Sequence, residues 1–329
     1  MKPNLLALIS ATGLLVLQMF LASEKARAAD PTPADLVDAL NGVFGKPQGT
    51  RSAHAKGFCL TGQFTPAPEA AKLSKAAHFA KPVPLTARFS LGGGDPKSPD
   101  NAKPNVRGLA IRFDLGGGAF TDLVMISAPV FFVTTPALFV EFLKTVGSGD
   151  KAKIDAFFAA HPESTQQAAW LNSHPIPASY AGVGYFGVHA FTFTNAAGEK
   201  ALVKYRAVPD AGELGLSDEE AASKGTNFYE AEIKERLGKG PVSFELQAIR
   251  GRDGDQTADS TQRWGDEDGR ETTPLGKISI EALAPASVCD AFSFLPGNVT
   301  DGIAGPADDP IFQIRSADYI VSFGRRRSQ

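Results

Sequence analysis

The sequence lacks several motifs that would point directly to a function. Its five histidines never fall in the H-E-x-x-H spacing of a zinc site, and no serine lies in the G-x-S-x-G turn of a hydrolase. The net charge is only -3, with 33 basic and 36 acidic residues, so no positive excess indicates nucleic acid as a partner. These absences argue against common hydrolase and DNA-binding classes.

Cysteine is scarce as well, since Cys59 and Cys289 are the only two in 329 residues. One pair in a chain of this size is no disulfide framework, and the sequence does not decide whether the two cysteines are bridged. Their separation also excludes the C-x-x-C-H motif of covalent haem attachment.

Long hydrophobic runs are confined to the N-terminus. Lys2 precedes an apolar run from Leu5 to Leu21, and Ala26-Arg27-Ala28 places small residues at the spacing that a signal peptidase requires. We expect residues 1–28 to be a signal peptide, cleaved after Ala28, and the remaining chain to be soluble, exported and periplasmic. An uncleaved membrane anchor is the alternative, although this run is at the short limit for spanning a bilayer.

Phenylalanine is abundant, with 23 residues, which suits a strand-rich core or an apolar cavity. Residues 109–115 and 242–248 alternate apolar and polar side chains with the period of a half-buried strand. Weaker alternation predicts further strands over residues 85–91, 120–126, 186–194, 202–208 and 277–283. The sequence therefore predicts about seven strands, joined mostly by glycine-rich or polar turns.

Helix signals lie before, between and after these strands. Thr32-Pro33 and Thr135-Pro136 each predict an N-cap followed by a first helical residue, and Ser217 with Glu220 forms a capping box. Asp309-Pro310 predicts a last helix from Ile311 to Phe323. Strands with inserted and appended helices predict class α+β, an antiparallel β-barrel or sheet with helices outside. No interdomain linker is apparent, so residues 29–329 are predicted to form a single domain.

Two candidate site residues lie near opposite ends of the chain. Arg315 and Tyr319 are four residues apart on the last helix and therefore share one face. A guanidinium beside a phenol favours the phenolate, which is a known axial ligand of haem iron. Near the N-terminus, His54 lies in the segment Arg51-Ser52-Ala53-His54-Ala55-Lys56-Gly57 and is a candidate base.

The segment around His54 resembles the distal R-x-x-H-A-K-G segment of the haem catalase family. The resemblance continues in chain order at Arg88-Phe89-Ser90, at residues 107–113, in the D-L-V and P-V-F-F segments of residues 122–132, and at Arg315 and Tyr319. It covers about residues 45 to 327. The end of the sequence, ten residues after Tyr319, makes it similar to the small, exported catalase-related peroxidases, which implies an antiparallel barrel of about eight strands with surrounding helices.

The resemblance also implies a cofactor, non-covalent haem b, and a role for each matching residue. Tyr319 would bind the iron, Arg315 would hold Tyr319 deprotonated, and His54 would be the distal base. Ser90 would hydrogen-bond the other nitrogen of His54 and fix its tautomer. Contacts to the haem and its propionates would come from Arg51, Arg88, Phe132 and Arg326.

The implied reaction is the reduction of hydrogen peroxide or an organic hydroperoxide through a ferryl haem, in peroxide detoxification. Counting back from Pro129, Ser127 takes the position of a distal asparagine that orients the second peroxide in catalases. Because a hydroxyl reaches less far than an amide, we expect weak dismutation and peroxidase turnover with electrons from a small organic donor. We expect a monomer or a homodimer.

Three alternatives stay open at this point. A haem catalase would dismutate hydrogen peroxide to water and oxygen. A haem carrier or storage protein would not need a distal base such as His54. An enzyme that isomerises fatty-acid hydroperoxides would share the ligand pair, but nothing in the sequence specifies a lipid channel.

Overall fold

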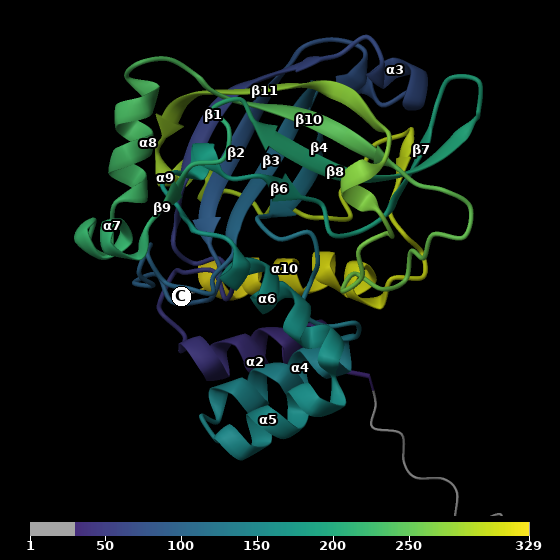
Figure 1. The fold of residues 1–329 in the computed structure, drawn as a ribbon. Coiled ribbons are helices and arrows are strands. Elements are labelled where there is room, and N and C mark those ends of the chain that lie inside the picture. Colours follow the sequence, from purple (N-terminus) through teal and green to yellow (C-terminus); the bar gives the residue numbers. More distant parts are fainter. Residues whose placement is uncertain (1–29, 329) are drawn as a thin grey trace, which may run out of the picture.

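The chain is described by a computed structural model over residues 30–328, so the predicted signal peptide, residues 1–28, lies outside the described residues. Its centre is a closed barrel of antiparallel strands (Figure 1). Around the barrel the eight strands follow in the order β10 (Val242–Arg250), β11 (Thr272–Ala284), β1 (Gly57–Pro66), β2 (Val83–Leu91), β3 (Arg107–Gly116), β4 (Ala119–Ile126), β6 (Tyr185–Phe186) and β8 (Lys200–Pro209). The pairing of β10 with β8 closes the ring. The predicted α+β class and the barrel of about eight strands are confirmed.

Four further short strands lie outside this ring. β7 (Phe191–Thr194) pairs with β8, and β12 (Ile303–Ala304) pairs with β7. β5 (Ile176–Pro177) and β9 (Gly215–Leu216) form a separate two-stranded sheet. The strand predicted over residues 186–194 is therefore two strands, β6 and β7, that pair with different parts of β8.

The sequence prediction missed β1. Cys59 and Leu60 are adjacent and both buried, Leu60 in the main core and Cys59 in a separate cluster with Cys289, and a glycine follows at position 62. Adjacent buried residues and a glycine without a side chain obscure the period of two by which a half-buried strand is predicted. The remaining predicted strands are confirmed.

Aromatic rings fill the interior of the barrel. Phe64 packs edge-on against Phe113, and Phe89 stacks on Tyr180 with ring centroids 5.0 Å apart. All four rings are almost fully buried. Burial of each such side chain contributes roughly 1.5–3 kcal/mol, so the phenylalanine content is largely explained by this core and makes the barrel a rigid support.

A layer of helices covers one end of the barrel. α10 (Pro310–Arg327) runs beneath the barrel, and α2 (Pro33–Phe44), α4 (Pro136–Gly147) and α5 (Lys151–Ala160) lie below α10 (Figure 1). A second hydrophobic core joins α2, α4 and α10 through side chains that include Leu36, Leu40, Phe139, Leu143 and Ile311. The caps predicted at Thr32, Thr135 and Asp309 are all present.

The other α-helices of the described residues are α3 (Ala70–Leu73), α6 (Gln166–Ser173), α7 (Asp218–Ser223), α8 (Tyr229–Leu237) and α9 (Ala286–Asp290). The capping box at Ser217 begins α7, as predicted. Within residues 30–328, every helix is too short or too polar to cross a lipid bilayer.

Candidate active site

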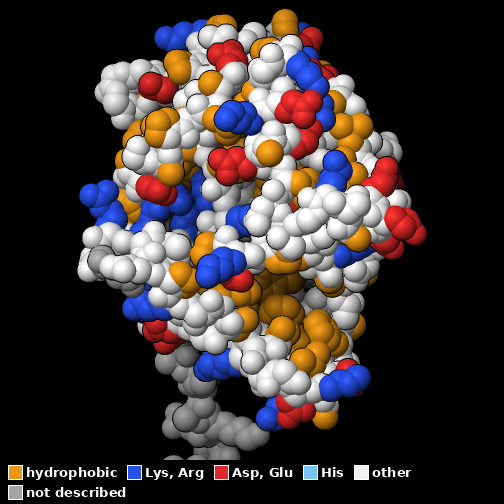
Figure 2. Space-filling view, turned by 90° about the vertical axis from the view of Figure 1, so that its left-hand side faces the viewer, with side chains coloured by type: hydrophobic (Ala, Val, Ile, Leu, Met, Phe, Trp, Pro, Cys, Tyr) orange, Lys and Arg blue, Asp and Glu red, His pale blue; other side chains and the backbone are white. Residues whose placement is uncertain are grey.

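A cavity of about 420 Å³ lies between the barrel and the helical layer, with walls formed mainly by hydrophobic side chains. Figure 2 shows a hollow lined with such side chains in the lower half of one face of the molecule. Eight of the nine site residues predicted from the sequence line this cavity, namely Arg51, His54, Ser90, Arg88, Phe132, Arg315, Tyr319 and Arg326. Residues from both ends of the chain therefore meet in one site.

His54 has an unusual backbone conformation. Its φ angle is +52°, in the left-handed region that a residue with a Cβ adopts only at some cost. The guanidinium of Arg88 donates hydrogen bonds to the carbonyl oxygens of His54, at 2.8 Å, and of Ala55, at 3.0 Å. These two bonds hold the strained turn and aim the imidazole into the cavity.

The imidazole of His54 lies against β2 and β3. Its Nδ1 is 3.0 Å from the hydroxyl oxygen of Ser90, as the sequence predicted. A Cβ at Gly108 would lie 2.6 Å from that hydroxyl oxygen and 3.0 Å from Nδ1, so only glycine leaves room for this pair. Burial, together with the charges of Arg88 and Arg315, lowers the pKa of His54 from 6.5 to about 3. His54 is therefore neutral at physiological pH and able to accept a proton at Nε2.

Tyr319 is the end of a hydrogen-bonded chain of four side chains. Arg315 donates from Nη2 to the phenolic oxygen of Tyr319 at 2.7 Å, and its Nη1 lies 2.9 Å from Nε2 of His189. His189 contacts Asp309 through Nδ1, at 2.6 Å from a carboxylate oxygen. His189 and Asp309 are both buried, so this chain is shielded from solvent.

The donors and acceptors in this chain fix its protonation pattern. Arginine can only donate, so Nε2 of His189 accepts and its Nδ1 carries the proton that Asp309 binds. Burial lowers the pKa of His189, which agrees with a neutral ring. The second oxygen of Asp309 accepts from the backbone N–H groups of Ile311 and Phe312 and caps α10. One carboxylate thus begins the helix and orients the guanidinium that contacts Tyr319.

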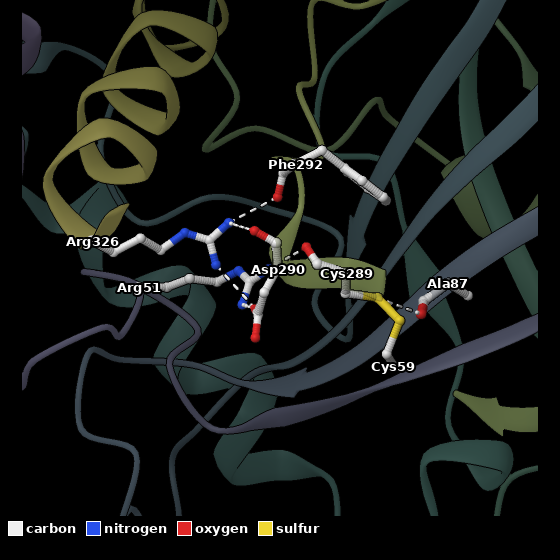
Figure 3. Close-up of a disulfide and its surroundings, with 7 residues drawn as sticks. All are labelled: Arg51, Cys59, Ala87, Cys289, Asp290, Phe292 and Arg326. Atoms are coloured by element: carbon white, nitrogen blue, oxygen red, sulfur yellow. Dashed lines mark hydrogen bonds and ion pairs between the residues drawn. A yellow bond between two sulfur atoms is a disulfide. The ribbon is translucent and has the colours of Figure 1, made fainter. Parts of the chain in front are cut away.

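Two more arginines meet at a carboxylate on the rim of the cavity (Figure 3). Arg51 and Arg326 donate to the same oxygen of Asp290, at 2.7 and 3.0 Å. Nε of Arg326 is buried and has no hydrogen-bond partner among residues 30–328. Burial, followed by the charge of Arg51, lowers the pKa of Arg88 to about 9. Three guanidiniums with one carboxylate leave an excess of positive charge that suits a ligand with carboxylate groups.

Ser127 is the predicted site residue that does not reach the cavity. Its hydroxyl accepts a hydrogen bond from the backbone N–H of Arg107 at 2.9 Å, and it faces a small cavity beside Trp170 instead. The neighbouring residue, Ile126, lines the main cavity. Side chains alternate along an extended chain, so counting from Pro129 selected the residue whose side chain points the other way.

Four residues of the site were not found from the sequence. His189 was interpreted as an ordinary core histidine and Asp309 only as a helix cap, because their partners are distant in the sequence. Asp290 gave no signal. Asp318 lines the cavity, and one of its carboxylate oxygens is buried without a hydrogen-bond partner in the described part of the chain. Burial raises the pKa of Asp318 to about 7. The one signal in the sequence that could have been used is that the carboxylate of Asp318 directly precedes Tyr319, the predicted iron ligand.

Comparisons with known proteins agree with this geometry. A sequence model of the family described as Catalase matches residues 47–327. The chain is 36% identical over 321 residues to "Catalase-related peroxidase" from Synechococcus elongatus, which covers 95% of this chain and 94% of that protein. It is 35% identical over 297 residues to the protein of the same name from Mycolicibacterium paratuberculosis, over 88% of this chain and 93% of that one.

Solved structures show the same architecture. A fungal catalase and catalase A from Saccharomyces cerevisiae each superpose with a TM-score of 0.75, over 89% and 88% of this chain and 63% and 64% of theirs. Their identities of 23% and 22% support the fold alone. The family match over most of the chain and the near full-length relatives confirm the resemblance, and the chain, a peroxide-acting oxidoreductase, belongs to the catalase family.

Proposed function

We propose that the protein is a haem-dependent peroxidase that reduces hydrogen peroxide or organic hydroperoxides with electrons from a small organic donor. The observation that carries this proposal is that one cavity is lined both by a neutral imidazole, at His54, and by a phenol, at Tyr319, that accepts a hydrogen bond from Arg315. A passive haem carrier would not need a strained, pre-oriented base.

The residues around the cavity fit haem b. Tyr319 would be the iron ligand, and the hydrophobic walls, which include Phe131 and Phe132, suit a flat apolar ring. The net charge of Arg51, Arg88, Arg326 and Asp290 is two positive, which matches the two carboxylates of haem. The unpartnered Nε of Arg326 is a donor that a carboxylate would satisfy.

The protein side chains would move the protons of the reaction. Bound haem would supply an iron position open to peroxide and the redox chemistry that cleaves the O–O bond. His54 would accept a proton from one peroxide oxygen at Nε2 and return it to the departing oxygen. Nδ1–H of His54 would donate to Ser90, which keeps Nε2 free for this task. Reduction of one peroxide consumes two electrons and two protons and gives an alcohol, or water, and a further water.

The apolar distal wall favours peroxidase turnover over dismutation. The hydroxyl of Ser127 accepts a hydrogen bond from the backbone of Arg107 and does not line the main cavity. The neighbouring residue Ile126 lines that cavity instead. A hydrocarbon side chain provides no hydrogen bond to orient a second hydrogen peroxide. An organic donor that reaches the cavity edge would then supply the electrons.

The site of action that we propose is the periplasm. The N-terminal apolar run followed by Ala26-Arg27-Ala28 supports export. The disulfide between Cys59 and Cys289 is consistent with an oxidising compartment. Fractionation of cells that express the full chain tests this assignment, and retention of full-length protein in the cytoplasm would contradict it.

The experiment for the whole proposal compares wild-type protein with Tyr319→Phe and Tyr205→Phe. Tyr205 is a buried tyrosine of the barrel that serves as a matched control. We expect a high-spin ferric Soret band in wild type and in the control, and its loss or shift in Tyr319→Phe. Peroxide consumption should depend on a phenolic donor such as guaiacol. Oxygen release near the dismutation ratio without any donor would instead establish a catalase.

A further inference from the structure

The disulfide between Cys59 and Cys289 ties one segment of the cavity rim to the barrel. Cys59 lies in β1 and Cys289 in α9, 230 positions apart in the sequence, and both are buried. Sγ of Cys289 also contacts the carbonyl oxygen of Ala87 in the adjacent strand β2. Asp290 follows Cys289 directly and ends α9 (Figure 3). The covalent bond therefore fixes the residue beside this carboxylate against the barrel wall.

The same segment anchors two arginines that come from opposite ends of the chain. Besides their shared contact with Asp290, Arg51 donates to the carbonyl oxygen of Cys289 at 2.9 Å. Arg326 donates to the carbonyl oxygen of Phe292 at 2.8 Å. Both side chains point toward this segment in Figure 3, and both line the cavity. Their positions relative to each other are thus set by residues 289–292.

The charges at this rim show why an anchor is needed. Arg51 and Arg326 repel each other where they converge, and burial together with the charge of Arg51 lowers the pKa of Arg326. Burial raises the pKa of Asp290, but its contacts with Arg51 and Arg326 outweigh this and hold the pKa below its ordinary value. Asp290 is therefore ionised, and without it the two guanidiniums would separate.

We propose that Asp290, held in place by the Cys59–Cys289 disulfide, is a positioning residue that sets Arg51 and Arg326 for the carboxylates of haem, so that tight haem retention requires the oxidised disulfide. This inference rests on the proposed function, because it assumes haem in the cavity. Reduction by dithiothreitol transfers two electrons and two protons to the sulfurs, gives two thiols and cyclised dithiothreitol, and frees α9 from β1. Exchange of the two thiols with an external disulfide, which takes up the two electrons and two protons and leaves as two thiols, would accordingly precede stable haem loading.

The test measures the rate at which the haem-loaded full chain loses haem to excess apomyoglobin. The variants are Asp290→Asn, the double replacement Cys59→Ser/Cys289→Ser, and the combination of all three replacements. Asp38→Asn is the matched control. Asp38 forms an ion pair with Arg325, which is next to Arg326 on α10 but does not line the cavity. We expect about tenfold faster haem loss for both test variants, as for other residues that orient a cofactor's partners, and the wild-type rate for the control.

Two further readouts separate positioning from a general loss of stability. If the disulfide acts through Asp290, the combined variant should increase the logarithm of the haem-loss rate by less than the sum of the two separate increases. Additive increases would overturn the inference. Haem dimethyl ester, in which both carboxyl groups are uncharged methyl esters, should dissociate from wild type and from Asp290→Asn at the same rate. A persisting difference with the ester would show a structural role only and refute the proposal.

The outcome also distinguishes this inference from the proposed function. A wild-type protein that takes up no haem refutes the proposed function. A wild-type protein that binds haem while Asp290→Asn and the cysteine variant release it at the wild-type rate, or more slowly, refutes the inference alone.

Discussion

The assignment of His54 as the base gives a prediction about pH as well as about rate. Replacement His54→Gln should slow the reaction of the haem-loaded protein with hydrogen peroxide by about 10²- to 10⁴-fold, the range for a positioned acid–base group. Glutamine retains a polar group near Ser90 but cannot take up and return a proton. The rate of this first step is read in a stopped-flow spectrometer from the change in Soret absorbance.

The pH dependence follows from the environment of the ring. Burial and the nearby guanidiniums of Arg88 and Arg315 lower the pKa of His54 to about 3. At about pH 5, only about 1% of such a ring is protonated, whereas about 97% of a ring with the ordinary pKa would be. Protonation of His54 should therefore cause no fall in the wild-type rate between about pH 8 and about pH 4.5, and any change near pH 7 from Asp318 should also occur in His54→Gln.

The control is His161→Gln, since His161 lies on the helical layer and does not line the cavity. This variant should retain the wild-type rate and the wild-type pH profile. A wild-type profile that falls as the pH drops through about 6.5, with no such fall in His54→Gln, would show that His54 titrates normally and refute the reasoning. A rate for His54→Gln within tenfold of wild type would refute its role as the base.

Two more predictions concern buried groups that do not line the cavity. Asp309→Asn should keep the cap of α10, because Asn caps a helix as well as Asp does, but it should weaken the contact to His189. The absorbance bands of the haem-loaded protein should then shift, and an unchanged spectrum would contradict the hydrogen-bonded chain from Asp309 to Tyr319. His78 is buried among phenylalanines, and burial lowers its pKa to about 4, so the unfolded chain binds its proton below 6.5 while the folded chain does so only near 4. Wild type therefore loses stability as the pH falls through this window. The free energy of unfolding of His78→Phe minus that of wild type should be about 3 kcal/mol larger at pH 4 than at pH 7.5, as measured by urea unfolding. An equal difference at the two pH values would contradict this prediction.

Local signals in the sequence were sufficient for most of the fold. Caps at Thr32, Thr135 and Asp309 and the alternation of residues 109–115 each act over a few neighbours, so they are legible without the rest of the chain. β1 was missed because Cys59 and Leu60 are both buried and Gly62 has no side chain, which obscures that alternation. The split of residues 186–194 into β6 and β7 depends on pairing with β8 and has no local signal.

The candidate site was predictable where a motif carried it and not elsewhere. His54 with Ser90, and Arg315 with Tyr319, were paired correctly because the matching segments occur in order along the chain. The contacts of His189 with Asp309 and of Arg51 with Asp290 join residues 120 and 239 positions apart, and only the fold brings them together. The orientation of Ser127 depended on a single residue of register, which a count along the sequence does not fix.

The double role of Asp309 has a consequence for which changes of length the chain tolerates. Asp309 sets both the first turn of α10 and the side chain that contacts Arg315, while Tyr319 lies on the same helix. Each residue inserted between the cap and Tyr319 would turn the phenol by about 100° around the helix axis and move it about 1.5 Å along the axis. Insertions and deletions in homologous chains should therefore be absent from residues 309–319 and be found in segments such as residues 195–199, an exposed turn that connects β7 and β8.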